Sequence, residues 1–327
     1  MGIPEPRSLG HGFHAVSVPL PFRSPAWVNC YMIEGARLTL LDCGVDWPEG
    51  LEALENGLRH VGFQPEAIDR LIVTHLHPDH VGMAPRLSER WNCEIIMHER
   101  SVQRIPRYND TAAFAESMRV LARRHGVPEQ MGPGFVDVST RAPFMPLMRD
   151  PDQVVADGDR IPLTDSRWLD VLHTPGHEAS HICLRDSLTG ILFSGDHVLP
   201  RITPVIMVDD EGTDVLGLYL ASLQRLIELE VGLTYPAHGG VVEHGARRAE
   251  QISLHHDRRL SGMLDVVSVA PRTAWDVMVE SYRPNLDSIE QRLALRETVS
   301  HLEHLCTRNE VSSFPEGDLW FYRRFTE

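Results

Sequence analysis

The stretch Leu71 to His80 reads LIVTHLHPDH, so an apolar, β-branched run leads directly into three histidines and an aspartate. His75 and His77 are one residue apart, and on an extended segment such side chains leave the backbone on the same side. Their two imidazole nitrogens can then bind one zinc ion at roughly 2.0–2.1 Å. Asp79 and His80 follow a proline, where the chain must turn, and can point toward a second position. The run predicts a metal site that needs ligands from elsewhere in the chain.

Three later segments place further candidate ligands just after an apolar, strand-like run. LDVLHTPGH ends in His177, ILFSGD ends in Asp196, and LTYPAHGG contains His238. Glycine or proline beside each candidate permits a sharp turn, so rigid strands would hold the site and turns would carry it. Imidazole with carboxylate suits zinc, and such a set also tolerates iron or manganese. Four segments that supply five histidines and two aspartates therefore predict a metal centre rather than ordinary core residues.

The overall composition restricts the class of partner. Lys+Arg 31 against Asp+Glu 46 gives a net charge of −15, and this balance disfavours nucleic acid, because binding to phosphates needs a basic face. The five cysteines are scattered without a C-x-x-C pair, which is typical of reduced thiols. The sequence shows neither an apolar signal segment nor an apolar run near 18 residues. We therefore expect a cytoplasmic protein that does not associate with membranes.

Short strand-like runs closed by Gly, Asp or Pro dominate residues 26–197, and a helix is expected over 51–60. Strands with helices outside them predict a layered α/β core. Residues 101–150 interrupt this pattern with an amphipathic helix over about 111–125 and a stretch rich in Gly, Pro and Met. This insertion is either a packed excursion or a lid over a substrate channel, and both interpretations stay open.

Beyond Gly245 the pattern is helical and ends in an expected hairpin, VSSFPEGDLWFYRRF. We predict a catalytic domain over residues 1–245. Residues 246–327 are predicted to form a helical linker and a small helical, winged-helix-like domain. Since its last helix mixes Arg292 and Arg296 with glutamates, we expect this domain to pack against the core and shape the mouth of the site rather than read DNA.

The segments THLHPDH, TPGH, SGD and PAHGG resemble, in order and approximate spacing, the four metal motifs of the metallo-β-lactamase superfamily. NCYMIEGARLTLLDCG resembles its opening hairpin, with Asp42 at the turn. The resemblance covers about residues 15–245 and implies an α/β fold, the αββα four-layer metallo-β-lactamase sandwich, with two zinc ions. By resemblance, the first metal is held by His75, His77 and His177, the second by Asp79, His80 and His238, and Asp196 bridges the two.

The resemblance also implies a chemistry. Two metals about 3.5–4 Å apart share a water and lower its pKa, so that a metal-bridged hydroxide can attack a carbonyl. Asp79 would be the catalytic residue, because it can accept a hydrogen bond from the nucleophile and pass the proton to the leaving group. The expected enzyme is a dinuclear zinc-dependent hydrolase of a small-molecule thioester, ester or lactone, including acyl-CoA-like substrates.

Differences from the ligand residues of known subfamilies narrow the choice of enzyme class within the superfamily. The commonest β-lactamases carry Arg in place of His80 and Cys in place of Asp196, and flavodiiron proteins carry Glu in place of His77. His181, four residues after His177, resembles the lactamase-β-like branch that has an added winged-helix domain. A metal-dependent endoribonuclease or phosphodiesterase, an iron sulfur-dioxygenase and a transcriptional regulator remain alternatives.

Three more residues are candidates for contacts with the ligands or the substrate. His181 and Asp42 lie in the motifs themselves, and Trp27 ends the loop before the first motif strand. A homodimer stays open, since no feature of the sequence decides the oligomeric state.

Overall fold

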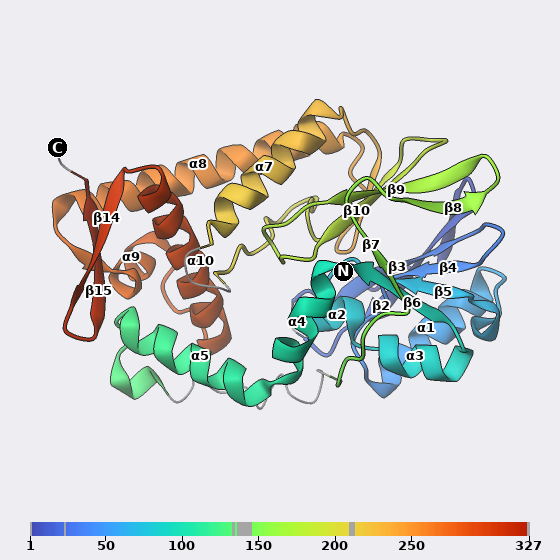
Figure 1. The fold of residues 1–327 in the computed structure, drawn as a ribbon, viewed down its shortest axis with the longest axis horizontal. Coiled ribbons are helices and arrows are strands. Elements are labelled where there is room, and N and C mark those ends of the chain that lie inside the picture. Colours follow the sequence, from blue (N-terminus) through green and yellow to red (C-terminus); the bar gives the residue numbers. More distant parts are fainter. Residues whose placement is uncertain (1, 23, 133–134, 136–145, 209–212, 326–327) are drawn as a thin grey trace.

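Two β-sheets packed face to face form the centre of the N-terminal part of the molecule (Figure 1). The computed structural model describes residues 2–22, 24–132, 135, 146–208 and 213–325. The first sheet has, in spatial order, β1 (Arg7–Gly10), β2 (Phe13–Pro19), β3 (Trp27–Ile33), β4 (Thr39–Leu41), β5 (Arg70–Ile72), β6 (Glu94–His98) and β7 (Gln153–Val155). The second sheet has the order β12 (Thr234–Pro236), β11 (Leu192–Gly195), β10 (Ile182–Asp186), β9 (Arg167–His173) and β8 (Arg160–Thr164).

The apolar residues of the strand-like runs fill the space between the two sheets. Phe13 of β2 and Phe193 of β11 meet edge to face, with ring centroids 5.0 Å apart. In β8, exposed and buried residues alternate, as expected for a strand with one face toward the core. The neighbouring strands β10 and β11 pair in an antiparallel ladder. Burial of these apolar side chains holds the two sheets together, and it fixes the register of the strands within each sheet.

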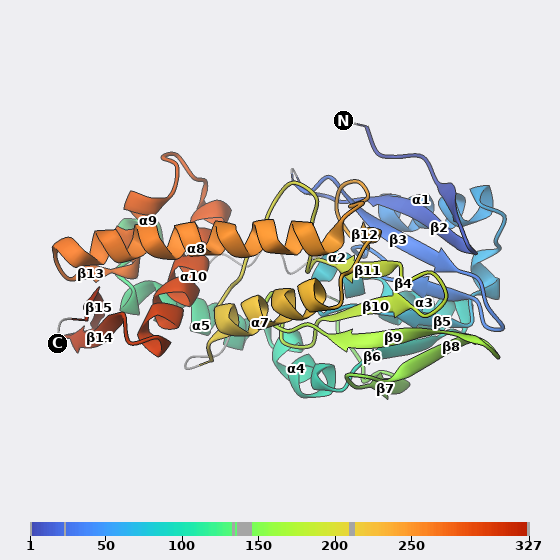
Figure 2. The same ribbon diagram turned by 90° about the horizontal axis from the view of Figure 1, so that it is seen from above.

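Helices cover the outer face of each sheet (Figure 2). On the first sheet lie α1 (Pro48–His60) and α3 (Ala84–Trp91), with η1 (Pro65–Ala67) and the short α2 (Pro78–Val81) nearby. On the second lie α7 (Val215–Glu228) and the beginning of α8 (Gly245–Val269). The helix expected over 51–60 starts earlier, at Pro48, because proline suits the first turn of a helix. The predicted αββα four-layer sandwich is confirmed.

The insertion expected over 101–150 contains α4 (Arg100–Asn109), α5 (Thr111–Arg124) and η2 (Glu129–Met131). The amphipathic helix predicted over about 111–125 is therefore confirmed. Asp110 caps it by accepting a hydrogen bond from Ala113 N at 2.8 Å. Most of the Gly-, Pro- and Met-rich stretch, residues 133–134 and 136–145, lies outside the described residues. From the catalytic layers, α5 extends to the last strand of the chain (Figure 1).

The C-terminal region is built on α8, which runs out of the sandwich as one long helix (Figure 2). Around its far half lie α9 (Ala274–Ser281), α10 (Ser288–Thr307) and a small sheet of β13 (Arg272–Thr273), β15 (Leu319–Arg324) and β14 (Val311–Glu316). The expected terminal hairpin is confirmed. The winged-helix assignment and the division at residues 245 and 246 stay predictions.

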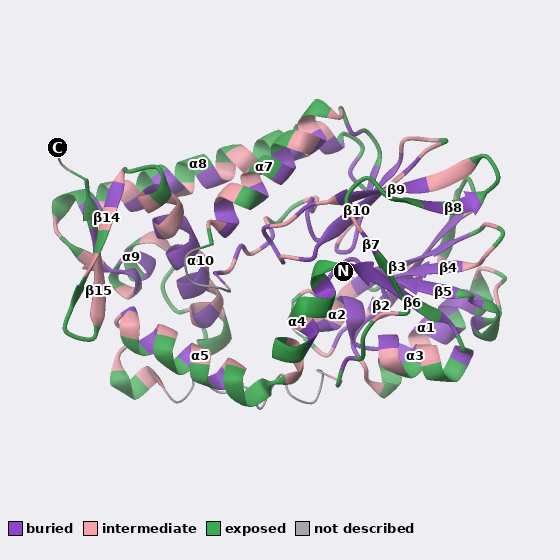
Figure 3. Cartoon of the chain, in the orientation of Figure 1, coloured by how far each residue is buried: buried purple, intermediate pink, exposed green. Residues whose placement is uncertain are grey.

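Buried side chains continue from the sheets into α7, α8 and α10, so one apolar cluster joins the second sheet to the C-terminal helices (Figure 3). Among the helices that the structure describes, none is long and apolar enough to cross a membrane.

Candidate metal centre

The four motif segments meet at one edge of the sandwich, where four strands end. His75 lies three residues after β5, His177 four residues after β9, Asp196 directly after β11 and His238 two residues after β12. Two groups of candidate ligand atoms result, each with its atoms within 4.8 Å of one another: His75, His77, His177 and Asp196 in one, and Asp79, His80 and His238 in the other. The structure therefore brings together all seven residues that the sequence proposed as ligands.

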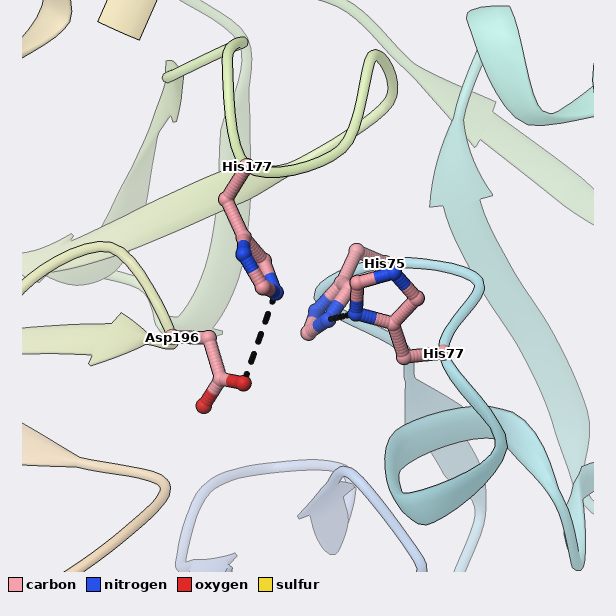
Figure 4. A group of neighbouring side chains, drawn as sticks. All are labelled: His75, His77, His177 and Asp196. Carbon is pink, nitrogen blue, oxygen red and sulfur yellow. Dashed lines mark hydrogen bonds and ion pairs between the residues drawn. The ribbon is translucent and has the colours of Figure 1, made fainter. Parts of the chain in front are cut away.

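In the first group, three imidazoles and one carboxylate point toward a common centre (Figure 4). His75 Nε2 lies 2.9 Å from His77 Nδ1, and His177 Nε2 lies 3.5 Å from Asp196 Oδ2. His75 therefore faces the common centre with Nε2 and His77 with Nδ1, although only one residue separates them. Alternation along the extended backbone places both rings on one side, as expected from the sequence.

The second group adjoins the first through Asp196. His80 Nε2 lies 3.5 Å from Asp196 Oδ2, and His238 Nε2 lies 3.4 Å from Asp196 Oδ1. Asp79 Oδ2 is 3.2 Å from His238 Nε2. The two oxygens of Asp196 thus face imidazoles of both groups, which is the position a bridging ligand requires.

Each of three imidazoles is oriented by a hydrogen bond from its other nitrogen. Nδ1 of His177 donates to Val205 O at 2.9 Å, and Nδ1 of His238 donates to Trp27 O at 2.8 Å. Nδ1 of His80 lies 2.8 Å from Asp42 Oδ2. A carbonyl can only accept, so in the neutral imidazoles of His177 and His238 the Nε2 atom carries a lone pair that faces the candidate centre.

Asp42 and His181 support residues that carry candidate ligands. Asp42 is buried with φ 56°, and its carboxylate accepts hydrogen bonds from Thr74 N at 2.8 Å and from the Thr74 hydroxyl. His181 Nε2 accepts a hydrogen bond from Asp196 N at 3.2 Å, and its Nδ1 bonds to Thr174 Oγ1 at 2.8 Å. Asp42 therefore fixes His80 and the start of the histidine segment, and His181 fixes Asp196.

Trp27 takes part in a different way from the two other candidates. Its backbone carbonyl, at the first residue of β3, contacts the site through His238. Since any residue supplies a carbonyl, the identity of the side chain does not matter for this contact.

The titratable side chains of the site shift one another's pKa. Burial raises the pKa of Asp79, but the imidazoles of His80 and His238 lower it further, so it stays below its usual range. Burial, followed by the neighbouring His80, lowers the pKa of His75 and keeps this imidazole neutral. Burial lowers the pKa of His80 and His238, but neighbouring carboxylates, Asp196 first, raise it above its usual range. Since carboxylates bind metals in the ionised form and imidazoles in the neutral form, metal binding would release the protons of these two imidazoles.

Three buried polar atoms of the site have no hydrogen-bond partner: His80 Nε2, His177 Nε2 and Asp196 Oδ1. Burial of an unpaired polar atom is costly, and in this edge of the fold the three atoms lie among the other candidate ligands. Divalent cations bound by the two groups would satisfy these atoms, so the residues fit the metal centre that the motifs predict.

Two glycines allow the ligand turns to approach the sheets. Gly176 has φ 135°, and a side chain there would overlap with Tyr219 of α7. Gly195 has φ 50°, and a Cβ there would lie 2.7 Å from His181 Nε2. Both positions need a glycine because of their backbone conformation and their lack of space.

Comparison with known proteins agrees with this geometry. Residues 26–238 match the family model described as the metallo-beta-lactamase superfamily, and this match spans more than half of the chain. The chain belongs to the metallo-beta-lactamase superfamily. The family resemblance inferred from the four motifs is thereby confirmed.

Members of the superfamily that resemble this chain include proteins of similar length. It is 26% identical to the probable metallo-hydrolase YqjP of Bacillus subtilis (strain 168), over 94% of this chain and 97% of that one. It is 30% identical over 208 residues to the acyl-coenzyme A thioesterase MBLAC2 of Gallus gallus, covering 62% of this chain and 67% of that protein. The crystal structure of a metallo-beta-lactamase family protein from Thermus thermophilus superposes with a TM-score of 0.83 at 27% identity, over 97% of this chain and 100% of that one. The C-terminal helices are therefore part of an arrangement that at least one other superfamily member shares.

Beside the candidate metal centre of this superfamily member, a cavity of about 150 Å³ opens next to His77 and His177. Its charged walls are Arg104 and Arg107 of α4, Glu178 next to a candidate ligand, and Arg296 of α10. Of these, the sequence singled out only Arg296, as part of a helix of mixed charge expected to shape the mouth of the site. No motif or spacing marks these residues, because they come together only when the insertion and the C-terminal helices fold against the sandwich.

Proposed function

We propose that this metallo-hydrolase binds two zinc ions and hydrolyses a thioester, ester or lactone. The observation that carries the proposal is the position of Asp196 between two groups of candidate ligands, with its two oxygens 3.4 and 3.5 Å from imidazoles of the second group. An imidazole-rich set with few carboxylates is favourable for zinc, although iron and manganese tolerate it.

When bound, a pair of such ions supplies a Lewis acid and a nucleophile at neutral pH. The chain supplies the remaining groups. The side chain of Asp79 is 16% exposed, whereas that of His80 is fully buried, so the carboxylate of Asp79 is the more accessible of the two from the solvent side. We assign to Asp79 the role of a proton acceptor that returns the proton to the leaving group. His177 and His238, held by backbone carbonyls, keep the lone pairs of their Nε2 atoms directed inward.

Two observations favour a thioester among the candidate substrates. Apolar side chains, among them Phe114, Val215 and Leu218, line the cavity beside the centre and suit an acyl chain. A relative with 30% identity is named an acyl-coenzyme A thioesterase. We therefore place an acyl thioester first, and esters and lactones after it. Cytoplasmic location and a homodimeric state remain predictions.

Metal content and hydrolysis, measured together, test the proposal. We expect the protein, purified without chelator, to hold about two zinc ions per chain and to cleave a panel of thioesters, esters and lactones. His238→Ala should lose the second ion and reduce kcat/KM about 100-fold or more. The matched control is His244→Ala, which changes an exposed histidine six residues later and should behave like the wild type.

Other outcomes identify the alternatives. Fewer than one transition-metal ion per chain, or full activity of His238→Ala, would refute the dinuclear hydrolase. Release of fragments from RNA that His77→Ala abolishes would support a nuclease instead. Stoichiometric iron with thiol-dependent oxygen uptake would support a sulfur-dioxygenase.

A further inference from the structure

The turn that carries His238 is held by one side chain of the first sheet. Asn29 lies in β3 and is only 6% exposed. Its amide Nδ2 donates to Pro236 O at 3.1 Å and to Gly239 O at 2.9 Å, and its backbone N donates to Ala237 O at 2.7 Å. Asn29 therefore binds backbone carbonyls on both sides of the candidate ligand.

The orientation of the Asn29 amide follows from its partners. The hydroxyl of Ser17 in β2 donates to Asn29 Oδ1 at 2.8 Å, while Nδ2 faces the two backbone carbonyls. A carbonyl can only accept, so a flipped amide would place its oxygen against two acceptors and lose both hydrogen bonds. The contacts thus require a side chain that donates on one side and accepts on the other.

The two ends of the turn depend on this amide to different degrees. Pro236 O also accepts a hydrogen bond from the Tyr31 hydroxyl, at 2.7 Å. Among the hydrogen bonds of the described residues, Gly239 O has the Asn29 amide as its donor. Loss of the amide therefore loosens the turn mainly on the side that follows His238 in the chain.

Strand β3 holds both the ring and the backbone of His238. Nδ1 of His238 donates to Trp27 O at 2.8 Å, and one residue of β3 separates Trp27 from Asn29. The carbonyl of Trp27 fixes the direction of the ring, and the Asn29 amide fixes the backbone from which the ring extends. Since a metal ligand must be held within about 0.5 Å of its productive position, the placement of Nε2 depends on both contacts.

The first group of candidate ligands is less dependent on Asn29. Its histidines follow β5 and β9, and among the described hydrogen bonds none joins these histidines to Asn29. Asp196, which faces both groups, is reached indirectly, because Ala237 N donates to Gly195 O at 2.9 Å. Loss of the Asn29 amide should therefore act first on the second group.

We propose that Asn29 is a positioning residue for His238 and that its amide determines whether the second metal ion binds. This inference rests on the proposed dinuclear centre, and it adds a residue that binds no metal itself. A chain that lacks the amide would keep the first ion and lose the second. The first sheet would thus control the occupancy of a site to which the second sheet supplies a ligand.

Zinc titrations of the full chain against a chromogenic chelator test the proposal, because they resolve the affinities of the two ions. Asn29→Leu keeps a side chain of similar shape but removes both donors of Nδ2. We expect the affinity for the second ion to fall about 10–100-fold and that for the first ion to change less than about twofold. Metal analysis should find about one ion per chain at a zinc concentration that gives about two in the wild type.

Two further variants complete the test. Ser17→Ala keeps both donors of Asn29 but removes the partner of Oδ1, so it should weaken the second ion severalfold, and it decides the question where Asn29→Leu does not fold. Asn109→Leu is the matched control. Nδ2 of Asn109 donates to Met148 O and its Oδ1 accepts from Met148 N, both at 2.8 Å, in segments that carry no candidate ligand. Both affinities should stay at their wild-type values in this variant.

The outcomes separate the inference from the function on which it rests. A role in stability alone would lower the free energy of unfolding without changing the ratio of the two affinities. A ratio that Asn29→Leu and Ser17→Ala leave unchanged, or that Asn109→Leu changes equally, overturns the positioning role and leaves the dinuclear hydrolase intact. A wild type that binds fewer than two ions overturns the dinuclear centre, and the inference with it.

Discussion

At the residue scale, the site depends on side chains that are not themselves candidate ligands. The carboxylate of Asp42 lies 2.8 Å from Nδ1 of the buried His80 and also binds the backbone of Thr74. The motifs made Asp42 a candidate from the sequence, but its partners became visible only in the fold. Contacts to backbone carbonyls, such as that of His177 with Val205, could not be predicted, because every residue type offers the same carbonyl.

Asp42→Asn tests this support. The asparagine keeps the shape but removes the charge that faces Nδ1 of His80, so we expect the affinity for the second metal ion to fall about 10–100-fold. Competition with a chromogenic chelator measures the affinity. Asp46→Asn, which affects a surface ion pair with Arg86 at 2.8 Å, is the control. Equal affinities in the two variants would show that Asp42 does not support the centre.

A second prediction concerns the turn before His177. Gly176→Ala combines an unfavourable φ of 135° with overlap against Tyr219, so α7 or the ligand turn must shift. We expect a loss of about 3 kcal/mol or more in the free energy of unfolding, together with reduced metal content. Gly62→Ala has a φ of 98° but open space around it, so it should cost only about 1 kcal/mol. Denaturant unfolding of both variants measures the difference, and similar losses would argue against the steric explanation.

At the scale of elements, the periodicity of apolar residues and the turn residues between the runs predicted most of the sandwich. Apolar runs closed by Gly, Asp or Pro gave the strands whose ends carry the candidate ligands, and the helix over about 111–125 matches Thr111–Arg124. Sequence reasoning did not place Arg296, since a charged residue on a helix normally faces solvent, whereas here it is buried in the cavity wall. Which face of α10 is buried depends on its packing against α7 and α8, and no local pattern encodes that packing.

The contact between α8 and α10 contains two buried histidines, His256 and His301. His256 Nδ1 lies 3.1 Å from His301 Nε2, and His301 Nδ1 donates to Glu297 O at 2.7 Å. His301 Nε2 therefore accepts, and His256 Nδ1 carries the proton. Burial, followed by the neighbouring His301, lowers the pKa of His256 to about 2, and burial lowers that of His301 to about 4. Charged or titratable neighbours on the two helices are His255, Arg259 and His304.

This pair predicts a loss of stability in acid. Above pH 6.5 both imidazoles are neutral in the folded and in the unfolded chain. As the pH falls from 6.5 toward 4, the unfolded chain binds protons that the folded pair does not bind, so the free energy of unfolding decreases. Between pH 7.5 and 5 the expected loss is on the order of 2–4 kcal/mol. Replacement of both histidines by leucine should remove most of this loss, and an unchanged pH dependence in denaturant titrations would contradict the assignment.

At the scale of the whole molecule, the candidate centre joins parts that otherwise interact through the apolar core. His75 and His77 follow β5 of the first sheet, whereas His177, Asp196 and His238 follow strands of the second sheet. The cavity beside them adds the insertion and α10. Metal binding, substrate binding and the stability of the sandwich are therefore linked through one edge of the fold.

Removal of the metal should consequently destabilise the sandwich as a unit. A ligand that binds only the folded chain stabilises it in proportion to the logarithm of its concentration over Kd, about 4 kcal/mol at 1,000 times Kd. Without the cations, the half-buried Asp79 and the buried Asp196 also lose a charge partner. We expect chelator treatment to lower the thermal midpoint by several degrees and zinc to restore it, as measured by calorimetry. The double variant His75→Ala/His177→Ala, which retains the second group of ligands, should respond much less to zinc. Equal midpoints of the metal-loaded and chelator-treated wild type would mean that the two sheets are not coupled through this edge.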